Sequence, residues 1–546
     1  MHRLVVLLVP AVALAATYAA PPRRAAPRPA GPPPLFETHE VCFACHNQLS
    51  TGEGEDVSIS TDWRASVMAN SSRDPYWQAS VRREVMDHPK AQAHIEDECS
   101  ICHMPMMRYQ ARAQGELGKV FENLPPGQSD DYMARLAADG VSCTMCHQIE
   151  PDRLGTRASF VGGFVVDTVR EPGERIVFGP WAIDSGRTRI MHSSSTFIPE
   201  QGLHIRESAL CATCHELYTE ALDREGRHIG RLPEQVPYQE WLHSRYVRER
   251  SCQNCHMPAV TDSIEVSGVW GRPRPALARH VFRGGNFLLL RMLDRYHVEL
   301  RADALPRELD EAALGTIAFL ETQAARVAVE QPRVEYGRLE ADVVVTNLTG
   351  HKLPTAYPSR RAWLHVTVRD ARGQVLFESG ALRRDGSIVG NDNDADPTRF
   401  EPHYRQITSP DQVQIFESIL RDPQGRVTTG LLSSVGYIKD NRVLPAGFDK
   451  ATAQPDIAVV GDAFGDPSFV GGSDRVHYSV PIGAAAGPLR VEARLWYQPI
   501  GFRWAHNLEP YDAVEPRRFV AYYEELSETT AVVLAAAEAT TAGGAR

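Results

Sequence analysis

The chain has 546 residues, of which 43% are apolar and 23% are charged, and its formal net charge is −11. This composition is ordinary for a globular protein, and the length allows several domains with sizeable cores. Binding to nucleic acid is driven by clustered lysine and arginine on a basic surface, so the acidic balance excludes nucleic acid as the expected partner.

Residues 1–20, MHRLVVLLVPAVALAATYAA, have the pattern of a secretory signal peptide: a basic start, a short apolar run and a tail of small residues. The apolar run is shorter than the ~20 residues of a membrane-spanning helix, which favours a removed signal over a short uncleaved anchor. Residues 21–35 form a proline-rich linker, and no later segment is apolar enough to span a bilayer. We therefore expect an exported, periplasmic protein that meets a membrane only through a complex.

All ten cysteines lie in CxxCH pentads, five in number, and none is left over. The pentads are Cys42, Cys45 and His46; Cys99, Cys102 and His103; Cys143, Cys146 and His147; Cys211, Cys214 and His215; and Cys252, Cys255 and His256. On a helical turn, residues i, i+3 and i+4 share one face, so the two thiols and the imidazole of each pentad project together. Two thioether bonds to one porphyrin and one histidine bond to its iron need this arrangement.

Two other interpretations of the cysteines fit less well. Disulfides would suit an exported protein but would not explain a histidine after every pair. Structural zinc takes four ligands, and five CxxC pairs cannot all be divided into complete four-cysteine sites. We therefore predict five covalently attached haem c (heme c) groups. The pentads begin only 41 to 68 residues apart, too close for separate haem domains, so they are expected to share one core within residues 36–330.

The second axial ligands are harder to assign, because 15 of the 20 histidines lie outside the pentads. The leading candidates from position are His192, His204 and His280; His88 and His94 precede the second pentad; and His39, His228, His243 and His297 are weaker, with a solvated surface role favoured.

Met68 is a candidate of a different kind. The segment from Trp63 to Met86 reads as two helices, the second opened by Asp74 as N-cap with Pro75 in its first position. Met68 is turned away from the apolar face that holds Trp63 and Val67. It either packs against a porphyrin or supplies a thioether ligand, which would raise that haem's potential. Met104 and Met106 read as haem-packing walls.

Several segments resemble multihaem cytochromes c with the haem-packing domain of the nitrifier tetrahaem cytochrome and, more distantly, of hydroxylamine oxidoreductase. These segments are FGP with a following His-bearing loop, SALCATCHELYT, YQEWLHSRYVRERSCQNCHMP and HVFRGGN, within about residues 36–285. The resemblance implies stacked haem pairs, mostly with two histidine ligands. A later piece, TNLTGHKLPTAYPSRRAWLHVTVRD, resembles the start of a β-rich C-terminal domain in some of these proteins. There the histidine of the GHxxPT element turns back to a haem, which adds His351 to the candidates beside the alternative of a simple turn residue.

The C-terminal half follows a different pattern. Residues 307–329 predict one helix, and then the apolar period becomes two in five segments. Those segments are LEADVVVTN, WLHVTVRD, QVLFESG, RVHYSVPI and LRVEARLWYQ, with a hairpin turn at residues 370–373. We predict a mixed fold, in which a mostly α-helical and irregular haem domain carries a β-sandwich-like domain over residues 331–519. A helix and tail are expected over residues 520–546.

The loop GNDNDADP places Asp392, Asp394 and Asp396 two residues apart, a spacing at which carboxylates can hold calcium. The glutamate expected at loop position twelve is missing, and His403 stands there instead. A solvated turn rich in aspartate is the favoured explanation, with calcium as the alternative.

Three classes of function fit these features. The first is an electron carrier whose partners are redox proteins, and the acidic charge suggests that a partner docks through a basic face. The second is a multihaem reductase of nitrite, hydroxylamine or a sulfur oxyanion, which needs one iron with an open position. The third is a docking subunit that uses the β-rich domain to bind a partner. The carrier is favoured, because there are at least as many candidate distal ligands as haem irons that need one.

Overall fold

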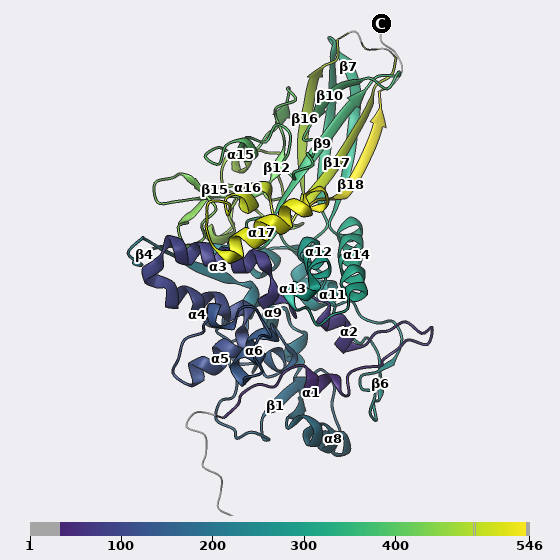
Figure 1. Ribbon diagram of the computed structural model, residues 1–546. Coiled ribbons are helices and arrows are strands. Elements are labelled where there is room, and N and C mark those ends of the chain that lie inside the picture. Colours follow the sequence, from purple (N-terminus) through teal and green to yellow (C-terminus); the bar gives the residue numbers. More distant parts are fainter. Residues whose placement is uncertain (1–32, 484, 486, 542–546) are drawn as a thin grey trace, which may run out of the picture.

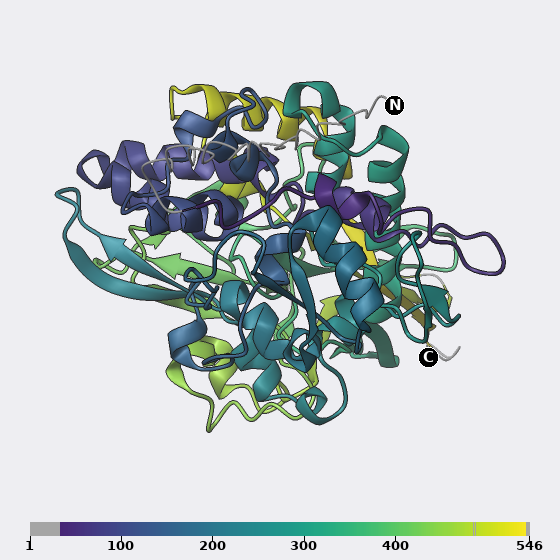
Figure 2. The same ribbon diagram turned by 90° about the horizontal axis from the view of Figure 1, so that it is seen from below.

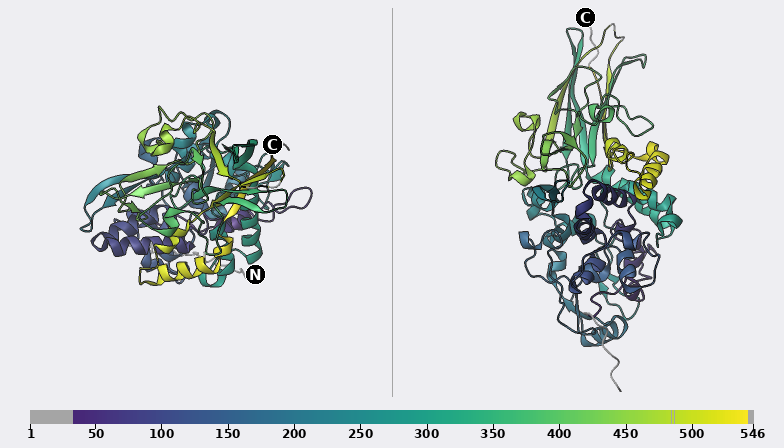
Figure 3. Two further views of the ribbon diagram at one scale, coloured as in Figure 1. Left: turned by 90° about the horizontal axis from the view of Figure 1, so that it is seen from above. Right: turned by 60° about the vertical axis from the view of Figure 1, so that its left-hand side comes forward.

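The structure is a computed structural model that describes residues 33–541 except residues 484 and 486. A β-sandwich stands on a region of short helices and loops (Figure 1; Figure 3, right). The predicted signal peptide and most of the predicted linker lie outside the described residues. Within the described residues, no helix is long and apolar enough to cross a membrane.

Short helices joined by long loops make up the N-terminal region. Its helices are α1 (Glu40–Phe43), α2 (Ile59–Arg64), α3 (Pro75–Asp87), α4 (Gln92–His103), α5 (Pro105–Ala113), α6 (Tyr132–Ala138), α7 (Cys143–Cys146), α8 (Ser185–Ser195), α9 (Ser208–His215), α10 (Pro237–Leu242), α11 (Cys252–His256), α12 (Phe287–Arg295), α13 (His297–Leu300) and α14 (Pro306–Gln323). Three small sheets pair β1 (Ile176–Gly179) with β2 (Ile198–Gln201), β3 (Leu217–Leu222) with β4 (His228–Gln235), and β5 (Ile264–Glu265) with β6 (Pro273–Arg274).

Helix α3 begins where the sequence predicts. The carboxylate of Asp74 accepts hydrogen bonds from the backbone N–H groups of Tyr76 and Trp77, and Pro75 takes the first helical position. The helix before it is shorter than predicted. Because α2 ends at Arg64, Met68 lies in the irregular segment between the two helices.

The C-terminal region contains the predicted sandwich. Its strands are β7 (Ala325–Glu335), β8 (Arg338–Asn347), β9 (Arg361–Arg369), β10 (Val375–Ser379), β11 (Gln406–Ile407), β12 (Ile415–Phe416), β13 (Ser418–Arg421), β14 (Val427–Thr428), β15 (Gly436–Asp440), β16 (Ser473–Pro481), β17 (Arg490–Gln498) and β18 (Val532–Thr540), and its helices are α15 (Asp392–Ala395), α16 (Phe502–His506) and α17 (Val514–Glu525). One sheet of the sandwich has the order β10-β9-β17-β18 with β12 beside β9, and the other has the order β11-β16-β8-β7. A third, small sheet has the order β14-β13-β15. The mixed fold class is therefore confirmed, and all five segments of period two form strands.

The sandwich is held by alternating side chains that face inward from both sheets. Val343 and Val345 of β8 and Val366 of β9 are fully buried in one core cluster with Val491 of β17. Such alternation gives each strand one apolar face, which is the reason the strands were visible in the sequence.

Two predicted elements at the edges of the sandwich are corrected by the structure. The helix predicted over residues 307–329 ends at Gln323, and Ala325 begins strand β7. The helix predicted from residue 520 covers only the end of α17, and residues 532–540 form β18, paired with β17. The alanine-rich run has a high intrinsic helix propensity. It forms a strand because it can pair its backbone hydrogen bonds with the edge of β17, and this tertiary contact overrides the local propensity.

A helix near the C-terminus of the chain packs against a helix near its N-terminus. Helix α17 packs against α3, where the guanidinium of Arg82 forms two hydrogen bonds of 2.9 Å to the carboxylate of Glu515 and the rings of Tyr76 and Phe519 lie 4.9 Å apart. Seen from below, the yellow C-terminal helix lies beside the purple and blue N-terminal helices (Figure 2). This contact joins the sandwich to the region that carries the pentads.

Candidate functional site

The five pentads line one interior cavity. All ten cysteines and all five pentad histidines contribute to its wall, and its volume is about 1900 Å³. A pocket for one small ligand usually measures about 300–1,000 Å³, so this cavity has room for more than one such molecule. The cysteines form no disulfides. The sequence prediction that the pentads share one core therefore agrees with their placement.

Thiols of neighbouring pentads approach one another in three places. Cys42 shares a hydrogen bond with Cys143, and Cys211 shares one with Cys252. The Sγ atom of Cys102 lies 3.9 Å from the carbonyl oxygen of Cys214. The first pentad is thus next to the third, the second next to the fourth, and the fourth next to the fifth.

Four pentad histidines are held by the same kind of contact. The Nδ1 atom donates to a backbone carbonyl oxygen: His46 to Val266 at 2.6 Å, His103 to Ser71 at 2.9 Å, His147 to Phe178 at 2.6 Å and His256 to Arg283 at 2.5 Å. This hydrogen bond fixes the tautomer and the ring orientation and leaves Nε2 free to bind a metal.

Desolvation by the surrounding chain keeps these imidazoles neutral at physiological pH. It lowers the pKa of His46, His147 and His256, and it lowers the pKa of both His103 and His215 to about 4. A metal binds the neutral ring, so the pentads present their histidines in the reactive form.

Two of the predicted distal ligands face a pentad histidine. The ring centres of His147 and His280 lie 6.4 Å apart with planes inclined by 21°, and those of His256 and His351 lie 6.3 Å apart with planes inclined by 17°. A metal bound to an imidazole lies about 2 Å from the nitrogen, and the nitrogen lies roughly 1 Å from the ring centre. Two such distances, one on each side of the metal, add up to about 6 Å, so one metal ion fits between the rings of each pair. The Nδ1 atoms of His280 and His351 donate to the carbonyls of Ala278 and Lys352, both at 3.0 Å, which leaves their Nε2 atoms free.

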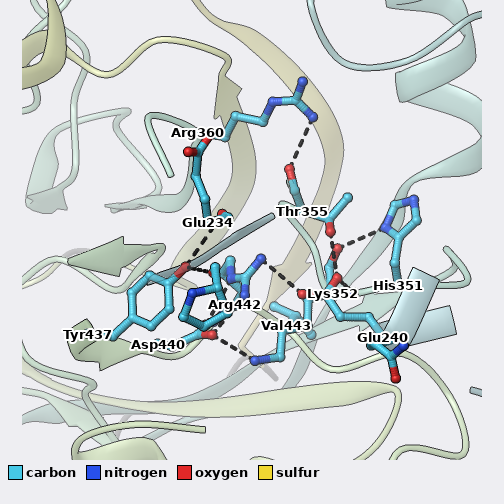
Figure 4. Close-up of polar contacts among 12 residues, drawn as sticks. Glu234, Glu240, His351, Lys352, Thr355, Arg360, Tyr437, Asp440, Arg442 and Val443 are labelled. Atoms are coloured by element: carbon cyan, nitrogen blue, oxygen red, sulfur yellow. Dashed lines mark hydrogen bonds and ion pairs between the residues drawn. The ribbon is translucent and has the colours of Figure 1, made fainter. Parts of the chain in front are cut away.

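The loop that carries His351 is tied to the pentad region by one buried carboxylate. Glu240, on α10, accepts hydrogen bonds from the backbone N–H of Lys352 at 3.0 Å and from the hydroxyl of Thr355 at 2.5 Å (Figure 4). Its other oxygen lies 3.1 Å from the guanidinium of Arg442. The contacts therefore flank His351 on its C-terminal side.

A buried ion network continues from Glu240 into the sandwich. The ammonium of Lys352 lies 2.7 Å from the carboxylate of Asp440, and the guanidinium of Arg442 lies 2.8 Å from the same carboxylate (Figure 4). All four side chains are buried, and their two positive and two negative charges balance. Burial alone would raise the pKa of Asp440, but the charges of Arg442 and Lys352 outweigh it and hold that pKa well below its usual value.

The structure does not bring His192 and His204 to the cavity. His192 is exposed, and its Nε2 atom donates to the carbonyl of Gly173 at 2.6 Å. His204 is buried, but its Nε2 atom donates to the carbonyl of Ile149 at 2.8 Å, and its ring packs on Phe178. Each has the nitrogen that would bind iron occupied by a backbone oxygen, so the prediction that these two are ligands finds no support in this geometry.

Some of the other ligand candidates line the cavity, and others do not. Met68 and His94 line the cavity. His88 is buried elsewhere, between the carbonyl of Asp223 and the hydroxyl of Ser433. Met104 and Met106 are fully buried in a cluster of apolar side chains and do not line the cavity, so the prediction that they are haem-packing walls finds no support in this geometry.

Arg360 is a cavity residue that the sequence analysis missed. One guanidinium nitrogen donates to the carbonyl of Thr355 at 3.1 Å, and within the described chain no carboxylate pairs with it. Its positive charge contributes to the lowered pKa of His215. The only signal in the sequence was the pair Arg360 and Arg361, and Arg361 is instead paired with Asp394.

The aspartates of the GNDNDADP loop have different partners. Asp392 pairs with Arg399, Asp394 pairs with Arg361 at 2.6 Å, and Asp396 accepts from the backbone and hydroxyl of Thr398. The three carboxylates are thus not gathered around a common point, and the calcium alternative gains no support from the loop.

His403 lies with Asp466 and Asp474 in a fully buried group of three potential metal ligands. The amides of Gln414 and Asn441 donate to Nδ1 of His403 at 2.9 and 3.2 Å, which places the ring proton on Nε2. That nitrogen donates to Asp466 at 3.1 Å. Both ring nitrogens of His403 therefore have hydrogen-bond partners within the protein.

Comparison with known proteins extends the picture of the fold. No protein-family model matches the chain, and no curated protein matches it. A solved structure, the crystal structure of a penta-heme cytochrome c552 from Thermochromatium tepidum, is similar with a TM-score of 0.52 at 18% sequence identity. The match covers 92% of this chain and 98% of that chain, so the shared fold includes both the pentad region and the sandwich.

Proposed function

We propose that this protein is an exported pentahaem c-type cytochrome that transfers electrons between redox-partner proteins in the periplasm. The observation that carries the proposal is that all fifteen chemically active side chains of five CxxCH pentads line one cavity. The similarity in fold to a penta-heme cytochrome supports it. When bound, haem supplies reversible one-electron chemistry, and the protein attaches it, orients it and limits its contact with water.

Each chain residue has a defined task in this proposal. The ten cysteines would form the thioether bonds, and His46, His103, His147, His215 and His256 would be the proximal iron ligands. His280 would hold the iron of the third pentad's haem from the other side, and His351 that of the fifth pentad's haem. Met68 remains the candidate thioether ligand. Arg360, a cation without a carboxylate partner, is suited to hold a haem propionate.

The haem number is the first test. We expect five haems per chain by intact mass and by pyridine haemochromogen absorbance, and four in the double variant Cys252→Ser and Cys255→Ser. Gln253→Ala, inside the same pentad, removes no attachment point and should keep five. An unchanged count in the double variant would contradict covalent attachment at the fifth pentad.

One observation favours the alternative function of a reductase. Among the described residues, His215 has neither the carbonyl contact of the other pentad histidines nor a facing imidazole like those of His147 and His256. Arg360, nearby, would attract an oxyanion. A stoichiometric high-spin signal in the oxidised protein, with catalytic current on adding nitrite, hydroxylamine or a sulfur oxyanion, would establish this function, whereas five low-spin haems would support the carrier.

A buried glutamate is expected to make one potential depend on pH. Glu234, on β4, lines the cavity and accepts a hydrogen bond from Thr219; burial, reinforced by the charge of Glu84, raises its pKa to about 7. Ionised Glu234 stabilises ferric iron. The potential of a haem on the second or fourth pentad should therefore fall as pH rises through 7, by up to about 59 mV per pH unit.

Voltammetry across pH 5 to 9 checks this expectation. Glu234→Gln should flatten the slope of that one wave, while Glu225→Gln, an exposed carboxylate in the turn between β3 and β4, should leave it in place. An equal slope in wild type and Glu234→Gln would assign the proton to another group.

A further inference from the structure

One loop covers the first pentad from outside. The carbonyl oxygen of Val266 accepts the hydrogen bond from Nδ1 of His46, and the backbone N–H of Gly268 donates to the carbonyl of Cys45 at 2.7 Å. A Cβ atom on Gly268 would lie 3.0 Å from the carbonyl of Asn47, so the loop approaches the pentad as closely as its backbone allows. The surface outside this loop is therefore separated from the first pentad by only one layer of chain.

That surface presents an exposed aromatic side chain. Trp270 is 75% exposed and its neighbour Val269 is 45% exposed, and both lie at the rim of the cavity. The guanidinium of Arg187, on α8, donates to the carbonyl of Trp270 at 2.8 Å. Trp270 has a positive φ of 51°, a conformation unusual for a tryptophan, so the backbone holds this residue in a defined place. Tryptophan is enriched at protein–protein interfaces relative to the rest of the surface.

Four arginines gather around Trp270, although the whole chain is acidic. The cavity rim there also includes Arg187, Arg206, Arg272 and Arg274. Arg206 and Arg274 lie over the ring of Trp181 at 5.4 and 6.0 Å. We call Arg187, Arg206, Val269, Trp270, Arg272 and Arg274 the Trp270 rim. Asp184 pairs with two of the arginines, Arg187 at 2.6 Å and Arg272 at 3.4 Å. Other acidic side chains exposed nearby are Glu200, Glu207 and Glu265. Among the described residues, Arg206 and Arg274 form no ion pair, so their positive charges are available to a partner.

The Trp270 rim lies far from the sandwich. Strand β6 and helix α8, which carry part of it, are at the end of the helical region opposite the sandwich (Figure 1). The first pentad touches the third through Cys42 and Cys143, so this end is also connected to the interior of the site.

We propose that the Trp270 rim is the docking surface for a redox protein with an acidic face. This inference rests on the proposed function. The net charge alone led us to expect a partner with a basic face, whereas the arginines at this surface favour a partner with an acidic face. One electron passes between the haem on Cys42 and Cys45 and the one-electron centre of the partner. One centre is oxidised as the other is reduced, and no bond forms or breaks. Apolar Trp270 and Val269 supply the dry centre of the contact, and the arginines steer the acidic partner.

The test uses the complete haem-loaded protein on gold electrodes coated with either carboxylate-terminated or ammonium-terminated monolayers. The carboxylate surface is the probe for an acidic partner. We expect electron exchange on carboxylate to be at least about tenfold faster than on ammonium, and to weaken as ionic strength rises from about 0.01 to 0.5 M. A protein governed by its net charge of −11 would show the reverse preference.

Two double variants with the same change in net charge separate local from global charge. Arg206→Glu with Arg272→Glu should lower the rate on carboxylate by about tenfold or more, and replacement of both by lysine should retain it. Arg333→Glu with Arg490→Glu, exposed in the sandwich, should have little effect. Circular dichroism and the haem absorption spectrum confirm that the variants are folded and loaded.

Three results would overturn the proposal: a faster rate on ammonium, an equal loss in both double variants, or displacement of the current by sulfate at constant ionic strength, which would indicate a small-anion site. Failure of the proposed function is recognised separately. A solution titration with soluble mediators does not depend on the rim, and fewer than five one-electron transitions there would count against the pentahaem carrier itself.

Discussion

Replacement of His351 by alanine is expected to convert one of five haems from a six-coordinate low-spin form to a high-spin form. The ring of His351 faces that of His256 at 6.3 Å, and its Nε2 atom is free. Alanine removes the imidazole nitrogen that faces His256 and leaves a void of imidazole shape, so the iron would lose one strong ligand. Low-temperature electron paramagnetic resonance of the oxidised protein measures the high-spin fraction, expected at one haem per chain.

Chemical rescue makes this test specific. Free imidazole should enter the void in His351→Ala and restore the low-spin signal, which a general loss of structure would not allow. His192→Ala is the matched control, because His192 is exposed and bonded to the carbonyl of Gly173. If His351→Ala kept five low-spin haems, His351 would be a turn residue and another group would occupy the fifth pentad's distal side.

The second large effect is expected from Asp440→Asn. Its carboxylate is shared by Lys352 and Arg442, and all three side chains are buried. Loss of one charge leaves the two cations with only Glu240, so one positive charge is buried without compensation. Breaking such a network by removing one partner typically costs about 3–5 kcal/mol in the free energy of unfolding. Denaturant unfolding at pH 7, followed by circular dichroism, gives the value.

The control for this change is Asp449→Asn, because Asp449 is exposed and holds only local contacts to Ala451 and Thr452. We expect it to lower the free energy of unfolding far less than Asp440→Asn does, as for most surface substitutions. Because the folded pKa of Asp440 is lowered, its contribution to stability is present above the unfolded pKa of about 3.8 and is lost as pH falls below that value. The destabilisation by Asp440→Asn should therefore shrink in acid, and a loss independent of pH would show that the charge is not its cause.

The covalent part of the candidate site could be read from the sequence because it is local. The spacing of each pentad brings Cys99, Cys102 and His103, for example, to one turn of α4. The strands of the sandwich were visible for the same reason, since an alternating pattern such as that of β8 is set by neighbours along the chain.

The distal ligands could not be ranked in this way. His204 and His280 were equal candidates by position, yet His280 faces His147 while His204 bonds to the carbonyl of Ile149. Which nitrogen is free depends on the chain segment packed against each ring. Glu240 gave no sequence signal, because its partners Lys352 and Thr355 lie more than a hundred residues away. Arg360 gave only the pair Arg360 and Arg361, which does not show that its side chain lines the shared cavity.

The sequence by itself thus determined five CxxCH pentads, the pattern of an export signal and a change from short helices to alternating strands. Only the tertiary structure decided which histidines face one another, that the last alanine-rich segment is a strand, and where basic charge gathers on an acidic chain. The physical reason is the same in each case. A motif depends on residues a few positions apart, whereas a metal's second ligand, an edge strand's partner and a local surface charge depend on segments that meet only when the chain is folded.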